Sequence, residues 1–562
     1  MTDSPENSAE RIAVKEGLAT PEETKLMAYA KSPKEILTIR AIVIAALGSA
    51  ILTASSLYVA LRMGALPWPS IFAVIVSMSI LKVFKGNLNE MNVSHTGMTA
   101  GALLAGGLAF TVPALWMLGY GEVPMNGILL GSLAAAIGGS LVTLILRDQM
   151  IVRLRLPYPI GIASFLTLKA GDVGGVKRNI LIISILIACL IVALRDWFGL
   201  VPAIIMFAGL IAYNIYVGIG IYPMALGIGY IIGLLYMGTW FLGAVFSHLI
   251  VVPIATNILG YTLVEAQNFT RSLGIGLIIG GGLAIILSAF LKYLTMQKTS
   301  LSIGKEISLA RTLPTRYILL FLVLLVALLI GGGLGPHIAV IAVLGMLVTS
   351  VMAAVVTGQT GIDPMEIFGI LILLFTMWIF GGISIVEGIL LVMFIACAVG
   401  IVGDCMNDLK AGYLLETPPR YQVISEVVGA IVGAIVGAFT LLMLVSVYGV
   451  GAFGPDKFFV APQAYAVSIM LRGIPNILAF VIGLIAGVVL GLLKIPSMTI
   501  GIGVYLPMII TVPAALGAFI RLIVDRKYPK LREHGVIFGS GLLGGEGIAG
   551  VIISLIYFLL GR

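Results

Sequence analysis

The sequence predicts an all-α protein that crosses the membrane many times, and three observations support this prediction. Of its 562 residues, 60% are hydrophobic and only 10% are charged, whereas soluble proteins carry about 25% charged residues. Apolar stretches of spanning length, about 20 residues for a helix, follow one another from residue 36 onward. These stretches do not alternate as membrane β-strands do. The composition also excludes a soluble enzyme, a nucleic-acid-binding protein and a disordered chain.

The first 35 residues are polar and carry both charge signs, so we expect a surface segment at the amino terminus. The apolar stretches that follow predict about 14–16 transmembrane helices, several of them broken or re-entrant. The expected spans are residues 36–62, 67–84, 96–117, 125–147, 179–195, 201–221, 224–256, 272–294, 316–334, 337–357, 366–381, 384–403, 424–449, 473–493, 498–520 and 536–560.

Charged residues in the loops predict the orientation. The chain has 33 Lys and Arg against 25 Asp and Glu, a net charge of +8, and cytoplasmic loops are enriched in Lys and Arg. Six basic residues lie in Arg147–Arg178 and five in Lys292–Arg316, so we expect both segments in the cytoplasm, together with the amino terminus. Segments 118–124 and 257–270 are expected outside. This pattern fits a plasma-membrane protein.

Three landmarks suggest an internal duplication. Thr96-Gly97 recurs as Thr360-Gly361, the prolines of RLRLPYP recur in ETPPRYQ, and Pro223 recurs as Pro496, all at offsets of about 260–275 residues. Such repeats are typical of secondary transporters. We therefore expect repeats at 36–294 and 316–562, joined by a basic cytoplasmic linker at 295–315.

One charge pattern conflicts with a parallel duplication. A parallel repeat would place the loop Arg521–Arg532 outside, on the face of 257–270, although its three Arg and two Lys favour the cytoplasm. A half-span near Pro496–Pro507 or in Phe458–Leu471 would remove the conflict.

Polar residues within apolar stretches are expensive in a membrane and mark candidate sites. The richest cluster lies in Asn87–Gly101, and from it we select as substrate-binding candidates Asn89, Glu90, Asn92, His95 and Thr96. We expect a helix to restart after the cluster, so that its amino-terminal amides point at an anionic group such as a peptide carboxylate. The alternative is a solvated loop with an Asn or Ser N-cap.

Two further segments, Leu156–Gly175 and Gly403–Gln422, contain prolines and glycines that suggest broken or re-entrant helices. Such backbone is tolerated within the membrane only where protein or water satisfies it. The alternative is that both are plain cytoplasmic loops.

Two carboxyl groups stand in apolar surroundings, Glu546 among glycines and Glu387 in ISIVEGILL. Each is a candidate proton carrier, or else an interface residue paired with Lys or Arg. His95 is a third candidate, because imidazole titrates near neutral pH, and Glu90 is a fourth.

Metal and nucleotide chemistry have little support in the sequence. The cysteines Cys189, Cys397 and Cys405 and the four histidines show no metal-ligand spacing, and no GxxxxGK[ST] motif is present. We therefore expect no metal, no cofactor and no enzymatic activity.

Five blocks of the sequence resemble the oligopeptide transporter family, which includes peptide carriers and the yellow-stripe-like carriers of metal–siderophore chelates, and the chain looks like a prokaryotic member. The blocks are Asn92–Gly119, Leu156–Gly171, Asn407–Gln422, Pro496–Pro507 and Gly539–Val551. The resemblance implies an all-helical carrier with an internal repeat that takes up small peptides or metal chelates with protons.

The same resemblance implies that the Asn92, Leu156 and Asn407 blocks line a central path, which adds three candidate substrate residues: Tyr158, Tyr413 and Gln422. Two departures from the family concern this path. Many relatives have Gln in place of His95, and they have an acidic residue in the block where this chain has Ile160 and Phe165.

The leading hypothesis is a secondary active, proton-coupled importer of small oligopeptides that works by alternating access. The first alternative is transport of a metal–siderophore or other metal–organic chelate. A more distant one is an intramembrane enzyme or a passive channel. The expected partners are a peptide or chelate, protons and the lipid bilayer, with no nucleic acid; homo-oligomerisation stays open.

Overall fold

The computed structural model describes residues 33–64, 69–170, 176–211, 213–300 and 315–561. The predicted polar segment 1–35 and the predicted linker 295–315 therefore lie mostly outside the described residues. Within them, helices make up most of the chain, and two strands, β1 (Ile204–Met206) and β2 (Gly218–Gly220), form an antiparallel pair.

The helices form two runs, one before residues 301–314 and one after. The first run is α2 (Ile39–Met63), α3 (Pro69–Val83), α4 (Leu88–Ala109), α5 (Ala114–Met117), α6 (Met125–Arg147), α7 (Pro159–Ala170), α8 (Val176–Val192), α9 (Ala208–Ile211), α10 (Pro223–Ala244), α11 (Val252–Asn257) and α12 (Leu263–Ser300). The second run is α13 (Thr315–Gly331), α14 (Pro336–Thr360), α15 (Met365–Phe380), α16 (Ile385–Leu414), α17 (Pro419–Tyr448), α18 (Pro462–Arg472), α19 (Ile477–Leu492), α20 (Ser497–Tyr505), α21 (Met508–Lys527) and α22 (Arg532–Leu559). Short 3₁₀ or π-helical turns are η1 (Pro33–Glu35), η2 (Asp148–Arg153), η3 (Ala193–Trp197), η4 (Val245–Val251), η6 (Val450–Ala452) and η7 (Pro529–Leu531).

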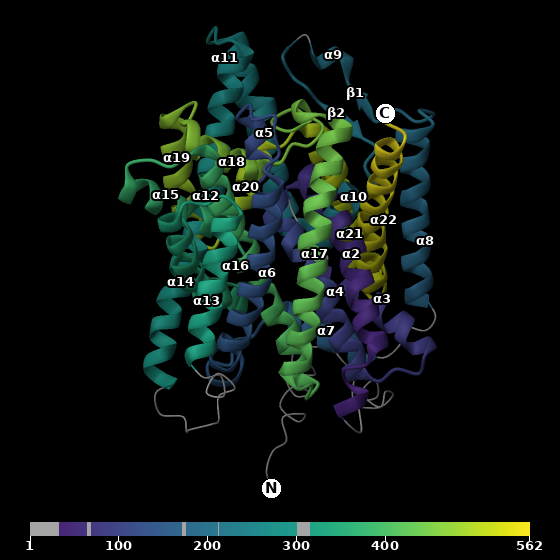
Figure 1. Cartoon of the computed structure of the whole chain (residues 1–562). Helices are drawn as coiled ribbons and strands as arrows, with labels where there is room; N and C mark the ends of the chain where they lie inside the picture. The colour runs from purple at the N-terminus through teal and green to yellow at the C-terminus, as the bar shows by residue number, and fades with distance from the viewer. Residues whose placement is uncertain (1–32, 65–68, 171–175, 212, 301–314, 562) are drawn as a thin grey trace.

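The predicted all-α membrane fold is confirmed. Eleven of the described helices are long and apolar enough to cross a bilayer, and five shorter apolar helices accompany them. Figure 1 shows the long helices side by side, with α9, α11, β1 and β2 at the upper end.

The predicted span 201–221 is wrong, because these residues form β1, α9 and β2, and Ile204–Met206 are exposed. Pro202, Gly209 and Gly218 interrupt this apolar stretch. Proline and glycine disfavour a continuous helix, so the segment folds as a surface cap instead.

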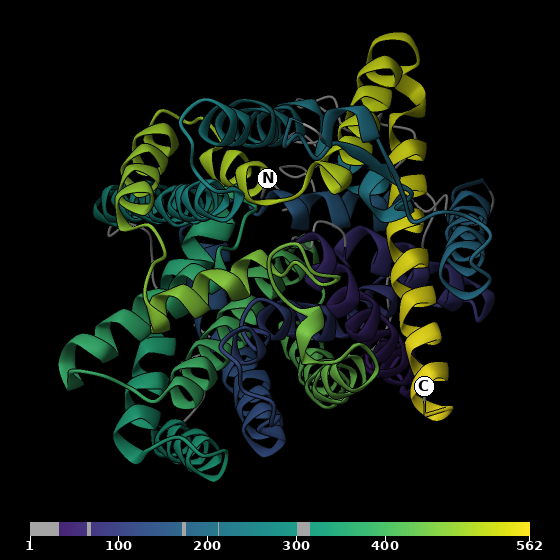
Figure 2. The ribbon, with the colours of Figure 1, turned by 90° about the horizontal axis from the view of Figure 1, so that it is seen from above.

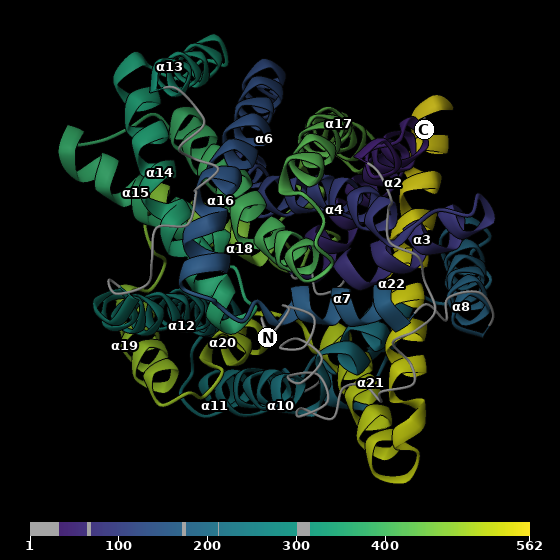
Figure 3. The ribbon, with the colours of Figure 1, turned by 90° about the horizontal axis from the view of Figure 1, so that it is seen from below.

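Helices α4 and α16 form the centre of the molecule. The most apolar part of the stretch Leu88–Met117 is completely buried, and 83% of the corresponding part of α16 is buried. Seen from below, α4, α7 and α16 lie between α13–α15 on one side and α8 and α22 on the other (Figure 3). A second group, α10, α12, α19, α20 and α21, packs along one edge of the molecule (Figures 2 and 3).

Helix α17 lies directly against α4 because glycines meet at their crossing. A Cβ atom on Gly429 would lie 1.8 Å from the carbonyl oxygen of Gly97, and one on Gly433 would lie 2.4 Å from the Cα of Gly101. Small residues at this spacing let two membrane helices pack backbone to backbone.

The helices repeat in the same order with nearly the same lengths. Helices α2 and α14 both have 25 residues, and both end at a left-handed glycine, Gly64 and Gly361. The next long apolar helices, Leu88–Met117 and Ile385–Leu414, have 30 residues each. These matching lengths indicate two copies of one arrangement, which begin at α2 and at α14. The predicted second repeat, 316–562, began one helix earlier, because it included α13.

The two copies are inverted relative to each other. Helices α4 and α16 occupy equivalent places in the order, yet they run antiparallel: Asn89 contacts Leu415 near the start of α4, and Gly107 contacts Cys397 near its end. An inverted repeat is one of the common architectures of secondary transporters.

A matched pair of backbone hydrogen bonds joins the copies. The amide of Tyr158 donates to the carbonyl of Gly358 (2.9 Å), and the amide of Ala461 donates to the carbonyl of Leu61 (3.0 Å). Each bond ties the start of a short helix, α7 or α18, to the end of the first long helix of the other copy. Both donor residues have a left-handed backbone, with φ values of 47° and 39°.

Two of the three sequence landmarks of the predicted duplication do not mark equivalent positions in the two copies. Thr96 lies inside α4, whereas Thr360 is the last residue of α14. Pro159 begins the 12-residue α7, whereas Pro419 begins the 30-residue α17. Helix order and direction reveal the repeat better than short motifs, because the packing of the two copies constrains helix length more than residue identity.

The inversion also resolves the conflict over the loop Arg521–Arg532. Glu533, which follows this loop, makes a 2.8 Å ion pair with Lys177 at the start of α8. The loop therefore lies at the same end of the molecule as the basic segment Arg147–Arg178. The parallel duplication would place it with 257–270 and is wrong.

Residues 223–257 form a helical hairpin rather than the single span predicted at 224–256. Gly233 reverses the chain with φ 76° and ψ −179°, a conformation that is essentially restricted to glycine. The Asn257 side-chain amide donates to the carbonyl of Tyr213 (2.9 Å), ten residues before α10 begins, so both ends of the hairpin lie on one face. If residues 223–257 formed one straight helix, its two ends would lie about 50 Å apart. The ten residues from Tyr213 to Pro223 reach at most about 35 Å, so Asn257 could not contact Tyr213 across a straight helix.

The second copy contains the equivalent break. The predicted span 498–520 is divided into α20 and α21 at Leu506-Pro507. Pro496 precedes α20 and Pro223 begins α10, so this pair of landmarks does mark equivalent positions. The short helix α20 corresponds to the half-span that the sequence suggested near Pro496–Pro507.

The segments 156–175 and 403–422 differ from each other. Helix α7 is short, as expected for a broken segment, and residues 171–175 lie outside the described part. Residues 403–414 continue α16 without a break, so the broken segment predicted there is wrong, as is the alternative of a plain loop. Pro418-Pro419 start α17, because proline is tolerated in the first turn of a helix.

Candidate functional site

Five predicted substrate residues lie in the first three turns of α4, and all are buried: Asn89, Glu90, Asn92, His95 and Thr96. The expectation that they precede a helix is wrong, because α4 already begins at Leu88. The side chain of the N-cap Asn87 accepts a hydrogen bond from the Glu90 amide (2.9 Å), which satisfies a free amide of the first turn. The burial also excludes the solvated-loop alternative.

Glu90 joins α4 to α2. Its carboxylate accepts two hydrogen bonds from Arg40, from Nε at 2.6 Å and from an Nη at 2.8 Å, and a third from the Thr38 hydroxyl. Two parallel bonds from one guanidinium form a strong and directional ion pair. Arg40 is partly exposed, so this pair lies at the edge of the protein rather than at its centre.

Asn89 and Asn92 point to the turn between α16 and α17. The Asn89 amide donates to the carbonyl of Leu415 and to the hydroxyl of Thr417, both at 3.0 Å, and the Asn92 amide approaches Thr417 at 3.5 Å. The carbonyl oxygen of the Asn92 side chain has no hydrogen-bond partner among the described residues.

His95 faces Asp408 of α16 at the centre of the molecule. The imidazole Nε2 lies 3.4 Å from a carboxylate oxygen of Asp408, and both side chains are almost completely buried. The other carboxylate oxygen accepts a hydrogen bond from Thr99. The backbone of Ser70, in α3, also approaches the imidazole, but neither ring nitrogen makes a well-formed hydrogen bond within the described part of the chain. Buried polar atoms without partners are uncommon in proteins, so this pair is a candidate site.

Gln422 of α17 completes a central polar group, which consists of Asn89, Asn92, His95, Thr96, Asp408 and Gln422. Its side-chain amide donates to the hydroxyl of Thr96 (3.0 Å) and to the backbone carbonyl of Asp408 (2.8 Å). Helices α4, α16 and α17 are thus joined through Thr96, Gln422 and Asp408. The structure brings together Asn89, Asn92, His95, Thr96 and Gln422, all of which are candidate substrate residues.

Four carboxyl groups in or near this group did not enter the sequence analysis as candidates: Asp363, Asp404, Asp408 and Glu426. Glu426 is completely buried, and its polar neighbours are Ser140, Thr143 and Cys405. Asp363 lies against α16, where a Cβ on Gly403 would be 2.1 Å from its carboxylate. No carboxylate oxygen of Asp363 or Glu426 makes a well-formed hydrogen bond within the described residues.

The sequence contained a signal for these carboxyl groups. Asp404 and Asp408 stand four residues apart, on one helix face, at the end of a long apolar stretch, and Glu426 stands four residues after Gln422. The prolines and glycines of residues 403–422 instead favoured a broken helix or a loop, so the polar face of a continuous helix was missed.

The two predicted substrate residues Tyr158 and Tyr413 contact other helices. The buried Tyr158 hydroxyl donates to the carbonyl of Ala354 (2.8 Å) and helps to fix α7 to α14. Its neighbour Gly161 donates its amide to the side chain of Asn407, next to Asp408 (3.2 Å). Tyr413 is partly exposed, and its ring lies near the Arg147 guanidinium (5.5 Å).

Glu387 and Glu546 lie away from this group. Glu387 is in the first turn of α16, where it accepts hydrogen bonds from the Gly335 amide (3.0 Å) and the Ser384 hydroxyl (2.7 Å). Asp408 follows 21 residues later on the same helix, about 30 Å away. Glu546 is completely buried and binds Arg195 (2.9 Å), so it is paired with an arginine, as the alternative interpretation expected.

A metal site is not formed by the described residues, since no three His, Cys, Asp or Glu side chains come close enough to hold an ion. The central polar group on α4, α16 and α17 can bind polar parts of a ligand, and it can exchange a proton. It combines amide and hydroxyl donors with an imidazole and carboxyl groups.

Two comparisons with known proteins agree with this arrangement. Residues 36–557 match the family model described as OPT oligopeptide transporter protein. The chain is also 26% identical to a Haemophilus influenzae protein named "Putative oligopeptide transporter", with 89% of this chain and 92% of that protein aligned. Because the family model covers nearly all of the membrane part, the chain belongs to the OPT oligopeptide transporter family.

Proposed function

We propose that the protein is a secondary active importer of small oligopeptides that is driven by the proton gradient and works by alternating access. The observation that carries the proposal is the buried group of His95, Asp408 and Glu426, which lies where the two inverted copies meet and lacks a full set of partners. The family membership and the name of the Haemophilus relative support the oligopeptide class of substrate.

Protons are the proposed coupling ion. A buried charge without a partner of opposite sign is costly. No Lys or Arg pairs with Asp408 or Glu426 in the described part of the chain. A proton, or the amino group of a peptide, is the simplest cation that neutralises these carboxyl groups. We assign the coupling step to His95 and Asp408, with Glu426 as a neighbouring acceptor.

The other predicted proton carriers already have partners. Glu90 and Glu546 are each bound by an arginine, and Glu387 is held by a serine and a backbone amide. We propose that these three carboxylates hold helices in place.

The substrate is proposed to bind along the amide and hydroxyl groups of the predicted path. A peptide has donors and acceptors along its backbone, and Asn, Gln, Thr and Tyr side chains complement both. The proposed contacts come from Asn89, Asn92, Thr96, Tyr158, Tyr413 and Gln422.

Alternating access would follow from the inverted repeat. One copy can tilt against the other around a site at their contact, which exposes it to each face in turn. The basic segments Arg147–Arg178 and Arg521–Arg532 lie at one end, and the positive-inside rule assigns that end, with the amino terminus, to the cytoplasm of a plasma membrane.

Uptake into proteoliposomes tests the proposal. With the vesicle interior more alkaline than the medium, labelled trialanine should accumulate above its external concentration, and it should only equilibrate without the gradient. Accumulation of an iron chelate but not of trialanine would favour the chelate alternative. Equal flux with and without the gradient would indicate a channel and overturn the proposal.

Asp408→Asn tests the coupling group. It should abolish gradient-driven accumulation while exchange of labelled for unlabelled trialanine persists, because exchange needs no net proton movement. Asp525→Asn, the same chemical change on the partly exposed α21, is the matched control and should accumulate trialanine as the natural protein does. Normal accumulation by Asp408→Asn would refute the assignment.

A further inference from the structure

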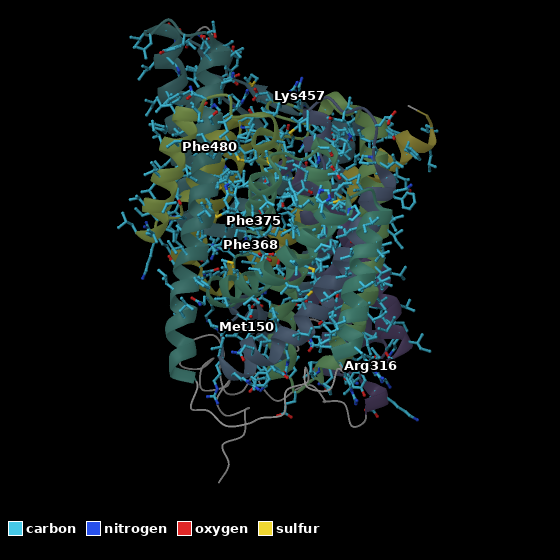
Figure 4. The ribbon with its side chains drawn as sticks, turned by 60° about the vertical axis from the view of Figure 1, so that its left-hand side comes forward. Met150, Arg316, Phe368, Phe375, Lys457 and Phe480 are labelled. Carbon is cyan, nitrogen blue, oxygen red and sulfur yellow. The ribbon has the colours of Figure 1, made fainter. Side chains whose placement is uncertain are left out.

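A second candidate site lies at the upper end of the molecule. A cavity of about 700 Å³ is formed by both copies, and its walls include Arg62, Tyr222, His248, Gln267 and Lys457. Figure 4 shows Lys457 near the upper end, and Met150 and Arg316 at the lower end. Cavities of this volume suit small organic ligands.

Arg62 is the unusual residue in the cavity wall. It is the penultimate residue of α2 and only 5% exposed. Its guanidinium group lies over the rings of Phe458 (4.0 Å) and Tyr222 (4.9 Å). Both rings stabilise the cation through cation–π contact. One terminal nitrogen is buried without any acceptor among the described residues.

The nearby carboxylates are already bound by other arginines. Asp196 and Glu546 both accept hydrogen bonds from Arg195, at 2.6 and 2.9 Å. Asp456, in the cavity wall, is paired with Arg271. Among the described residues, Arg62 therefore has no directly bound anion, and the Glu546 carboxylate acts on it only from a distance. A ligand that supplies an anion would lower the cost of burying this cation.

The cavity and the His95 group are separate. Thr53 of α2 packs against Gly101 of α4, and the two helices run parallel. Arg62 lies nine residues beyond Thr53, and His95 lies six residues before Gly101, so the two sites are about 20 Å apart along the helices.

We propose that this cavity is the outer entry site for the substrate and that Arg62 binds the carboxylate at the carboxyl end of a short peptide. The inference rests on the proposed function for the identity of the substrate. A guanidinium presents its donors as a fork that matches a carboxylate. Tyr222, His248 and Gln267 surround the remainder of the ligand. Since Arg62 and Lys457 come from different copies, a peptide held here contacts both moving parts.

Equilibrium binding in detergent, without any gradient, tests the site. The probes are trialanine and its carboxyl-terminal amide, which differ only in the carboxylate. The natural protein should bind trialanine at least tenfold more tightly than the amide. Arg62→Gln should lose this preference by weakening the binding of trialanine alone, and Arg62→Lys should restore part of it. Arg472→Gln removes one positive charge from the exposed end of α18, outside the cavity wall, and is the matched control that should keep the preference.

Each outcome bears on one proposal. An unchanged preference in Arg62→Gln, or equal binding of acid and amide by the natural protein, overturns the carboxylate site. Absence of gradient-driven uptake by the natural protein, with the preference present and lost in Arg62→Gln, overturns proton coupling but supports the carboxylate site. Bound amide, which needs no carboxylate, shows that Arg62→Gln is folded.

Discussion

Individual buried polar side chains in this protein fall into two kinds. Glu90 and Glu546 are fully bonded to arginines, and they join helices that are far apart in the sequence. His95 and Glu426 are equally buried but lack a full set of partners. A fully paired charge strengthens a contact between helices, whereas an unpaired one indicates a place where a ligand or proton arrives. Burial alone does not distinguish the two kinds; the partners do.

Glu90→Gln distinguishes a structural from a coupling role for this residue. The neutral amide cannot keep the charged pair with Arg40, so we expect a lower midpoint of thermal unfolding in detergent, a loss of about 1–3 kcal/mol. Gradient-driven uptake per folded molecule should persist. Uptake lost at unchanged stability would instead make Glu90 a proton carrier, as the sequence alone suggested.

At the level of helices, breaks define the architecture. Gly233 divides α10, and Leu506-Pro507 separates α20 from α21. Each break lets a short apolar helix turn back toward the face from which it came. Irregular backbone at membrane depth is tolerated only when protein surrounds it, and the tight packing of α10 against α20 and α21 provides this.

Gly233→Ala tests the hairpin. A Cβ atom is strained at φ 76°, and we expect a loss of stability of about 1–3 kcal/mol, seen as a lower unfolding midpoint. Gly238→Ala, on the same helix, is the control, because its Cβ would meet no atom within 4 Å. Equal stability of the two variants would contradict the reversal at Gly233.

For the whole molecule, inversion of the two copies has a direct topological consequence. It places the loop after α21 and the segment before α8 on one face, and the cavity that contains Lys457 on the other. The basic segments Arg147–Arg178 and Arg521–Arg532 therefore lie at the same end of the molecule.

Labelling of single cysteines by a membrane-impermeant thiol reagent tests the topology. In a variant whose three cysteines are replaced, Lys530→Cys should react only from the cytoplasmic side and Lys457→Cys only from outside. The natural Cys189, Cys397 and Cys405 serve as internal controls before replacement, since two are buried and one is partly buried. Reaction of both positions from one side would contradict the inverted repeat.

The sequence by itself determined the helical membrane fold and the polar residues of α4, and it suggested a repeat. Hydropathy and the cost of polar groups in lipid act locally, so they are readable from a single stretch of chain. The tertiary structure alone decided the inversion of the copies, the strand pair at 204–220, the Arg40–Glu90 pair and the proximity of His95 to Asp408. These features depend on residues up to several hundred positions apart, and only packing brings such residues together.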